Sequence, residues 1–239
     1  MNFNTINLIV LGIALSGGLI LLLRDWRLTV PALLLNYGFV AAFLAQQQFI
    51  RPDLQIGAYP ISTMVLIKLI TGGSAIAILV VTALTFSREY NIEDLDEFSL
   101  TELRRAARRA QQQRAIQPLR LTDYVVPIWA LVLAAIASLA LPRLYPIGTE
   151  EIDFVWYWLG LIGLFTMVSA ADILKIGIGL LLCIESISLL YTALARAVQV
   201  IPLALLSLTT VVLALVIAYL SGLLYGRLKT LELNELYKP

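Results

Sequence analysis

Long apolar runs occupy most of the chain and are separated by short polar stretches. A helix needs about 20 apolar residues to cross the hydrocarbon core of a bilayer. Inside the bilayer every backbone N–H and C=O must be paired within the chain, so such runs predict helices rather than isolated strands. Alternating strands of about ten residues, typical of a membrane β-barrel, are lacking. The pattern predicts an all-α, polytopic membrane bundle of seven helices, over residues 6–23, 28–49, 61–86, 124–142, 154–171, 176–195 and 200–225.

Lysine and arginine are distributed unevenly over the predicted loops. The first, third and fifth loops and the C-terminal tail together hold 13 of the 17 basic residues, and the other three loops hold three. Cytoplasmic loops of membrane proteins carry the excess of basic residues. This asymmetry predicts an N-terminus outside and a C-terminus inside the cell.

The amino-acid composition limits the kinds of cofactor and catalytic site that the chain could hold. The chain is 60% hydrophobic and only 14% charged, where a water-soluble domain carries about 25% charged residues. It has no histidine and one cysteine, Cys183, so we expect no haem, iron–sulfur cluster, zinc or other cofactor bound by this chain. No phosphate-binding loop, nucleophile triad or nucleic-acid signature is present. We therefore expect neither a catalytic centre nor a nucleic-acid partner.

A charged stretch over 87–123 divides the predicted helices into a three-helix unit over 1–86 and a four-helix unit over 124–227, with a tail over 228–239. This stretch begins acidic and becomes basic, and its capping-box spacing predicts a helix from about 100 to 116. Four arginines of that helix lie at i, i+4 spacing, where like charges repel unless an anionic surface is near: Arg104, Arg105, Arg108 and Arg109. Docking on anionic lipid or an acidic partner and a solvated linker helix both remain open.

Glu185 lies near the middle of the sixth predicted helix. An ionisable group at that depth is costly and usually functional. A carboxyl group that takes up and releases a proton there would serve an ion relay. The alternative is a protonated glutamate that hydrogen-bonds a neighbouring helix and only holds the bundle together.

Lys68 lies about seven residues into the third predicted helix. A buried lysine could act as a second relay group or as the counter-ion of a carboxylate. It could also extend its ammonium to the membrane surface, roughly 10 Å away at 1.5 Å per residue. The position alone leaves both interpretations open.

Other polar residues are weaker candidates. Asp172 and Lys175 stand at the cytoplasmic entry of the sixth predicted helix and could form a proton entrance, or simply mark the helix boundary. Ser207, Thr209 and Thr210 add hydroxyl groups to the seventh predicted helix, where they could hold water or join helices.

Short motifs give the chain a family resemblance. Residues 178–180 (Ile-Gly-Leu) and 202–209 (Pro-Leu-Ala-Leu-Leu-Ser-Leu-Thr) resemble a small three-helix protein, found as the C component of Mrp-type antiporters and as the K-type component of respiratory complex I. Over its whole length the chain is similar to component E of hydrogenase-4. The segments that carry this likeness are Arg-Asp-Trp-Arg-Leu at 24–28, Leu-Ile-Lys-Leu around Lys68, and Lys-Thr-Leu-Glu-Leu-Asn-Glu-Leu at 229–236.

The resemblance implies a place in the proton- or sodium-pumping membrane arm of a larger complex, beside large antiporter-like subunits, in a bacterial or archaeal cytoplasmic membrane. It also implies that Glu185 and Lys68 belong to a chain of buried charges that carries ions. The K-type component usually has two intramembrane glutamates. Here Glu185 is offset from both positions, and hydroxyl groups stand where the second acid would be. A non-conducting structural subunit and a stand-alone transporter are the alternatives.

Overall fold

Seven long helices form the described part of the chain. The computed structural model describes residues 3–23, 25–47, 54–56, 59–88, 122–170, 172–195 and 200–228. Each of the seven helices contains a stretch long and apolar enough to cross a membrane. The helices are α1 (Phe3–Leu22), α2 (Trp26–Gln46), α3 (Thr63–Arg88), α5 (Thr122–Leu144), α6 (Glu150–Ser169), α7 (Ile173–Leu194) and α8 (Val200–Leu228). The prediction of an all-α, seven-helix membrane bundle is confirmed, with helix ends a few residues from those predicted.

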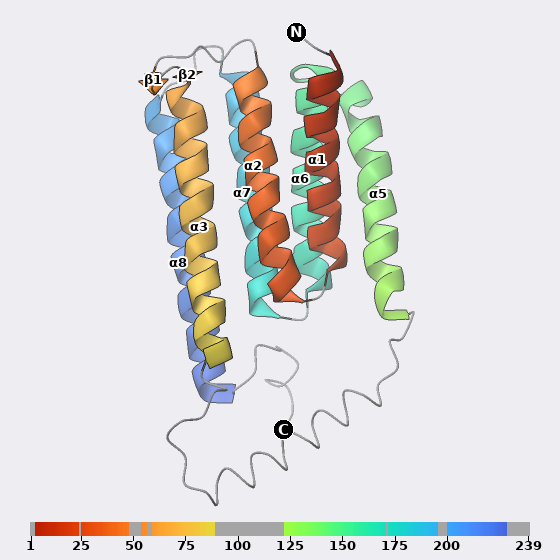
Figure 1. The fold of residues 1–239 in the computed structure, drawn as a ribbon. Coiled ribbons are helices and arrows are strands. Elements are labelled where there is room, and N and C mark those ends of the chain that lie inside the picture. Colours follow the sequence, from red (N-terminus) through yellow and green to blue (C-terminus); the bar gives the residue numbers. More distant parts are fainter. Residues whose placement is uncertain are drawn as a thin grey trace, which may run out of the picture.

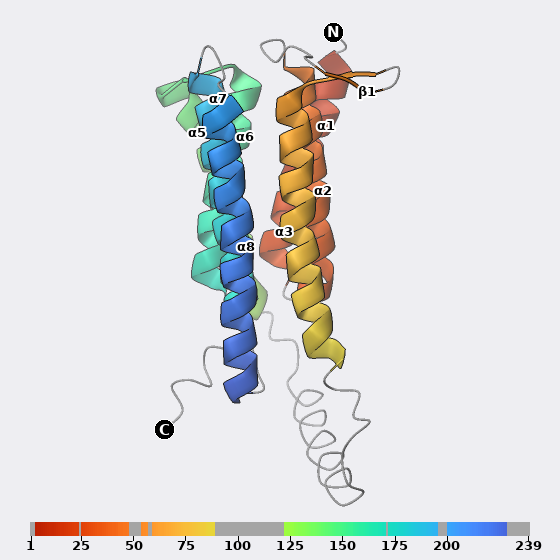
Figure 2. The same cartoon turned by 90° about the vertical axis from the view of Figure 1, so that its left-hand side faces the viewer.

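The helices form two facing layers. α1, α2 and α3 make one layer, and α6, α7 and α8 make the other, with α1 opposite α6, α2 opposite α7 and α3 opposite α8 (Figure 1, Figure 2). Each helix runs in the same direction as the one that it faces (Figure 1). α5 stands at the edge of the bundle against α6 and α1. The described side chains of α5 are largely exposed and apolar, as expected of a helix that faces lipid or a partner.

A short hairpin joins α2 to α3 at one end of the bundle, which we call the hairpin end. Its strands, β1 (Leu54–Ile56) and β2 (Tyr59–Ile61), pair antiparallel with Leu54 opposite Ile61. These strands were not predicted from the sequence. Three residues are too few to show an alternating pattern, and Pro60 inside β2 argues against a strand assignment.

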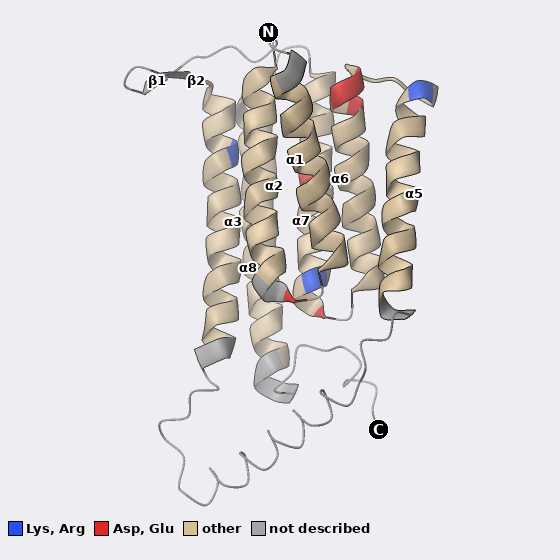
Figure 3. Ribbon diagram, turned by 45° about the vertical axis from the view of Figure 1, so that its right-hand side comes forward, with Lys and Arg blue, Asp and Glu red and all other residues tan. Residues whose placement is uncertain are grey.

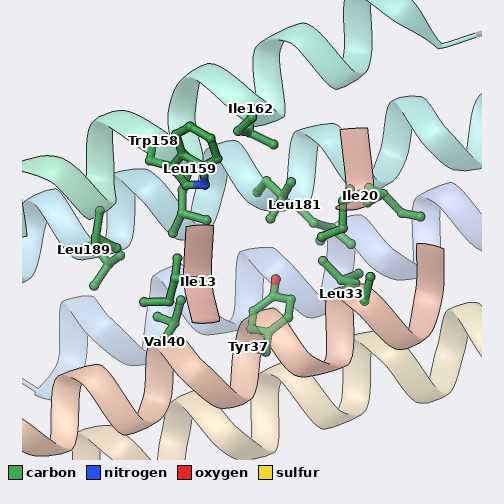
Figure 4. Close-up of a cluster of buried hydrophobic side chains, with 14 of the residues drawn as sticks. Ile13, Ile20, Leu33, Tyr37, Val40, Trp158, Leu159, Ile162, Leu181 and Leu189 are labelled. Carbon is green, nitrogen blue, oxygen red and sulfur yellow. The ribbon is translucent and has the colours of Figure 1, made fainter. Parts of the chain in front are cut away.

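Apolar side chains fill the space between the two layers. Figure 4 shows Ile13 of α1 and Val40 of α2 directed toward Leu159 of α6 and Leu181 of α7. One polar contact is embedded in this core, where the Asn36 amide of α2 donates to the Ser16 hydroxyl of α1 over 2.9 Å. Apolar packing and such interhelical hydrogen bonds are the forces that associate helices in a membrane.

The backbones of α6 and α7 approach each other closely at two glycines. A Cβ atom on Gly163 would stand 2.6 Å from the carbonyl oxygen of Gly179, and a Cβ on Gly179 would stand 2.6 Å from that of Gly163. About two turns along the same interface, the Ser186 hydroxyl donates to the Trp156 carbonyl over 2.6 Å. Small residues let helix backbones approach in membranes. This contact fixes α7, and with it the depth and rotation of Glu185.

Gly163 provides a test of that contact. We expect Gly163→Val to lower the stability of the protein by about 1–3 kcal/mol or more, because the added atoms would overlap the α7 backbone, which cannot move aside as a flexible side chain would. The control is Gly73→Val, since nothing lies within 4 Å of a Cβ at Gly73 of α3. Thermal unfolding in detergent measures both. Equal midpoints for the two variants would contradict the close contact.

Candidate functional site

Lys68 and Glu185 form a buried ion pair between the two layers. The Nζ atom of Lys68 on α3 lies 3.0 Å from Oε1 and 2.9 Å from Oε2 of Glu185 on α7, so the ammonium donates to both carboxylate oxygens. The two residues are 5% and 2% exposed. They are 117 positions apart in the chain, and the sequence alone does not show whether they meet. The structure brings them together.

The fold explains why the two side chains meet at this depth. Lys68 lies about 8 Å along α3 from its first residue, and Glu185 lies about 14 Å before the last residue of α7, at 1.5 Å per residue. The first residue of α3 and the last residue of α7 both lie at the hairpin end, so these two lengths are depths from the same end. The long lysine side chain covers the difference of about 6 Å between them. The ammonium contacts Glu185 instead of extending to the membrane surface.

The energetics of such a pair are finely balanced. Removing two charges from water costs several kcal/mol per ion, and their attraction offsets this only when the geometry is good. Here the geometry is good, because one ammonium bonds both oxygens of one carboxylate. Figure 3 shows how few charged positions lie along the middle of the described helices. A single added proton on Glu185 would remove the attraction while leaving Lys68 charged and buried.

Asp172 and Lys175 lie elsewhere, at the end of α7 opposite the hairpin end. Asp172 is the N-cap of α7, and its carboxylate accepts from the Lys175 backbone N–H over 2.6 Å. The Lys175 ammonium donates to the carbonyl oxygens of Leu21 and Leu23, at 3.1 and 3.0 Å. Carbonyls at a helix C-terminus have no partner within the helix, so Lys175 caps α1 and joins it to α7. Ten residues, about 15 Å of helix, separate Lys175 from Glu185.

The hydroxyl groups of α8 do not extend the site. Thr209 and Thr210 donate to the carbonyls of Leu205 and Leu206, one turn earlier in their own helix. Ser207 is buried, and its hydroxyl has no hydrogen-bond partner among the described residues. The four arginines predicted to dock on lipid or a partner, and the helix predicted over 100–116, lie outside the described residues.

Asp153 is a buried carboxylate that was missed in the sequence. It is 2% exposed and accepts from the backbone N–H groups of Ile147 and Gly148, at 2.9 and 3.0 Å, and from the indole N–H of Trp156 at 3.3 Å. These three donors satisfy the carboxylate, which holds the turn before α6. Its position, just before a predicted span that begins at 154, made it look like a boundary residue. A glycine five residues upstream was the available signal for a capped turn.

Two further findings complete the description of the site. Among the described residues, no group of three or more histidine, cysteine, aspartate or glutamate side chains could hold a metal ion. Comparison of the chain with models of known protein families, with curated proteins and with solved structures gave no match. The function therefore has to be argued from the Lys68–Glu185 pair and its surroundings.

The pair predicts strong energetic coupling between its two members. We expect Lys68→Met alone to destabilise the protein by about 3–5 kcal/mol, because it leaves the Glu185 carboxylate buried without its counter-ion. In Lys68→Met/Glu185→Met no charge remains, and most of that loss should be recovered. Chemical unfolding of the two single variants and the double variant in detergent gives the coupling energy. Additive effects of the two substitutions would show that the pair does not form.

Proposed function

We propose that this chain is a membrane-arm subunit of a multisubunit ion-translocating complex of the hydrogenase, complex I or Mrp antiporter kind. In this proposal the Lys68–Glu185 pair carries part of proton or sodium translocation. The observation that supports it most is the burial of the Lys68–Glu185 ion pair between two layers of apolar helices. The resemblances around Lys68 and at 202–209 support the same assignment. The proposed setting is a bacterial or archaeal cytoplasmic membrane, with large antiporter-like subunits as neighbours.

The chemistry of the pair suits a relay. With Glu185 ionised, the pair is neutral overall and the ammonium is held by both oxygens. A proton that arrives on Glu185 makes the carboxyl neutral and leaves one net positive charge on Lys68. That charge repels cations nearby and attracts anionic groups, an effect that is strong in a medium of low dielectric constant. Loss of the proton restores the pair, so each cycle can drive a displacement of charge in an adjoining subunit.

A structural subunit is the second candidate, and one observation favours it. Both lysine ammonium groups within the described helices are fully engaged, Lys68 with Glu185 and Lys175 with the end of α1. Replacing a buried ion pair with apolar residues is often neutral or stabilising, so stability alone does not account for the pair. In the structural alternative, the pair sets the register of the two layers and conducts nothing.

Neutralising Glu185 distinguishes the relay function from the structural one. In the intact complex we expect Glu185→Gln to abolish coupled ion transport while the complex assembles, because glutamine keeps the size and hydrogen-bonding capacity of the side chain but cannot take up a proton. The control is Glu151→Gln, which removes a carboxylate from the first turn of α6, at the end of the bundle. Ion uptake into membrane vesicles, driven by the electron donor or by a pH gradient, measures both variants. Wild-type transport by Glu185→Gln would refute the relay and leave the structural role.

The proposed setting has its own test. We expect purification of the tagged chain from its native membrane in mild detergent to recover large antiporter-like subunits, which mass spectrometry would identify together with any hydrogenase or quinone-reductase proteins. An unrelated seven-helix membrane protein carrying the same tag controls for non-specific capture. Recovery of this chain alone would contradict the assignment to a membrane arm.

A further inference from the structure

Tyr37 of α2 places a hydroxyl group inside the bundle without satisfying it. The side chain is 5% exposed, and its hydroxyl has no hydrogen-bond partner among the described residues. Figure 4 shows the ring extending from α2 with the oxygen at its tip, among the side chains that separate the layers. Most buried polar groups in proteins are hydrogen-bonded, so an exception needs a reason. Phenylalanine would fill the same space without the unsatisfied hydroxyl.

The ring lies beside the Lys68–Glu185 pair. A Cβ on Gly72 of α3 would stand 2.8 Å from Cγ and Cδ1 of Tyr37, so the ring packs directly on that glycine. Gly72 follows Lys68 by four residues, which places the two on the same face of α3, one turn apart. α2 and α7 face each other, and Tyr37 and Glu185 each lie nine residues before the end of their helix at the hairpin end. Tyr37 therefore lies at the depth of Glu185 and against the face of α3 that carries Lys68.

A protonated Glu185 carboxyl group would require a hydrogen-bond acceptor, and the Tyr37 hydroxyl can serve as one. The carboxylate accepts two hydrogen bonds from Lys68, which has donors and no acceptor. Once a proton binds to one oxygen of Glu185, the new O–H group needs an acceptor that a lysine ammonium cannot provide. A phenol oxygen accepts a hydrogen bond and also donates one. The Tyr37 hydroxyl can therefore accept the hydrogen bond of a protonated Glu185 carboxyl group, which Lys68 cannot accept.

We propose that the Tyr37 hydroxyl is the hydrogen-bond partner of the protonated Glu185 carboxyl group, and that it positions this group during each cycle. The inference rests on the proposed relay function. In the step that it describes, one proton binds to a carboxylate oxygen of Glu185, the salt bridge opens, and the new O–H donates to the phenol oxygen. No proton is transferred to Tyr37. When Glu185 loses the proton, the carboxylate returns to Lys68.

Other titratable groups are poorly placed for this role. On α6, which packs against α7, they are Glu150, Glu151, Asp153 and Tyr157, all in the first turns of the helix. Asp153 is occupied by its three donors. On α8 the described titratable group in the span is Tyr219, which is 67% exposed. On α7 itself, Cys183 directs its thiol to the Gly160 carbonyl of α6 at 3.7 Å, Lys175 bonds the end of α1, and Tyr191 lies six residues beyond Glu185.

Infrared difference spectroscopy of the intact complex, between high and low pH, tests the proposal. The band of the protonated Glu185 carboxyl is the one that disappears in Glu185→Gln. In Tyr37→Phe we expect this band to move to higher frequency, because a carboxyl group that loses a hydrogen bond has a stiffer C=O bond. The matched control, Tyr219→Phe, removes a phenol hydroxyl on the exposed side of α8 and should leave the band in place. We also expect Tyr37→Phe to slow ion transport about fivefold to tenfold, the value of one lost hydrogen bond.

An unmoved band in Tyr37→Phe would overturn the proposal, and so would the absence of any Glu185 band across the pH range. These outcomes are distinct from failure of the proposed function. Wild-type transport by Glu185→Gln would refute the relay, whereas the spectrum would still report whether Tyr37 contacts the protonated carboxyl. Phenylalanine keeps the ring on Gly72, so the variant should fold, and its recovery with the partner subunits checks this.

Discussion

The desolvation of two opposite charges between helical layers is the constraint on which the rest of the structure depends. Lys68 and Glu185 stabilise each other as ions, because either charge alone would be costly in this apolar interior. One residue belongs to α3 and the other to α7, so the two layers must keep a fixed register and depth. The Gly163–Gly179 contact holds α7 against α6, and Lys175 ties the far end of α7 to α1. The bundle thus positions the pair from several sides.

This placement gives the pair a mechanical consequence. A salt bridge within one layer would affect only that layer. This one joins the layer of α1–α3 to the layer of α6–α8. In the proposed cycle, a proton on Glu185 would remove this contact between the layers and leave a buried positive charge on α3. Both effects act on the same interface. A packed interface has a few discrete arrangements rather than a continuum, so a local charge change can shift it as a whole.

The sequence alone predicts the helices because membrane burial demands length and apolarity, and both can be read directly from the chain. It also identifies Glu185 and Lys68, since charges stand out in an apolar run. Their contact could not be predicted, because 117 residues of chain and the packing of two layers determine it. The partners of Lys175 could not be predicted either. Its ammonium bonds backbone carbonyls at the end of a helix far along the chain, and backbone carbonyls have no sequence signature. Tyr37 lacked a signal for the opposite reason, because an aromatic side chain is ordinary in an apolar helix.

The two buried lysines show why chemistry, rather than burial, assigns a role in ion movement. Lys175 bonds the backbone carbonyls of Leu21 and Leu23, which do not take up protons near neutral pH. Lys68 bonds a carboxylate, and a proton added to that carboxylate would change the charge of the whole site. Residue type and burial are the same in both cases. The proposed relay therefore rests on the carboxylate partner of Lys68 and not on burial alone.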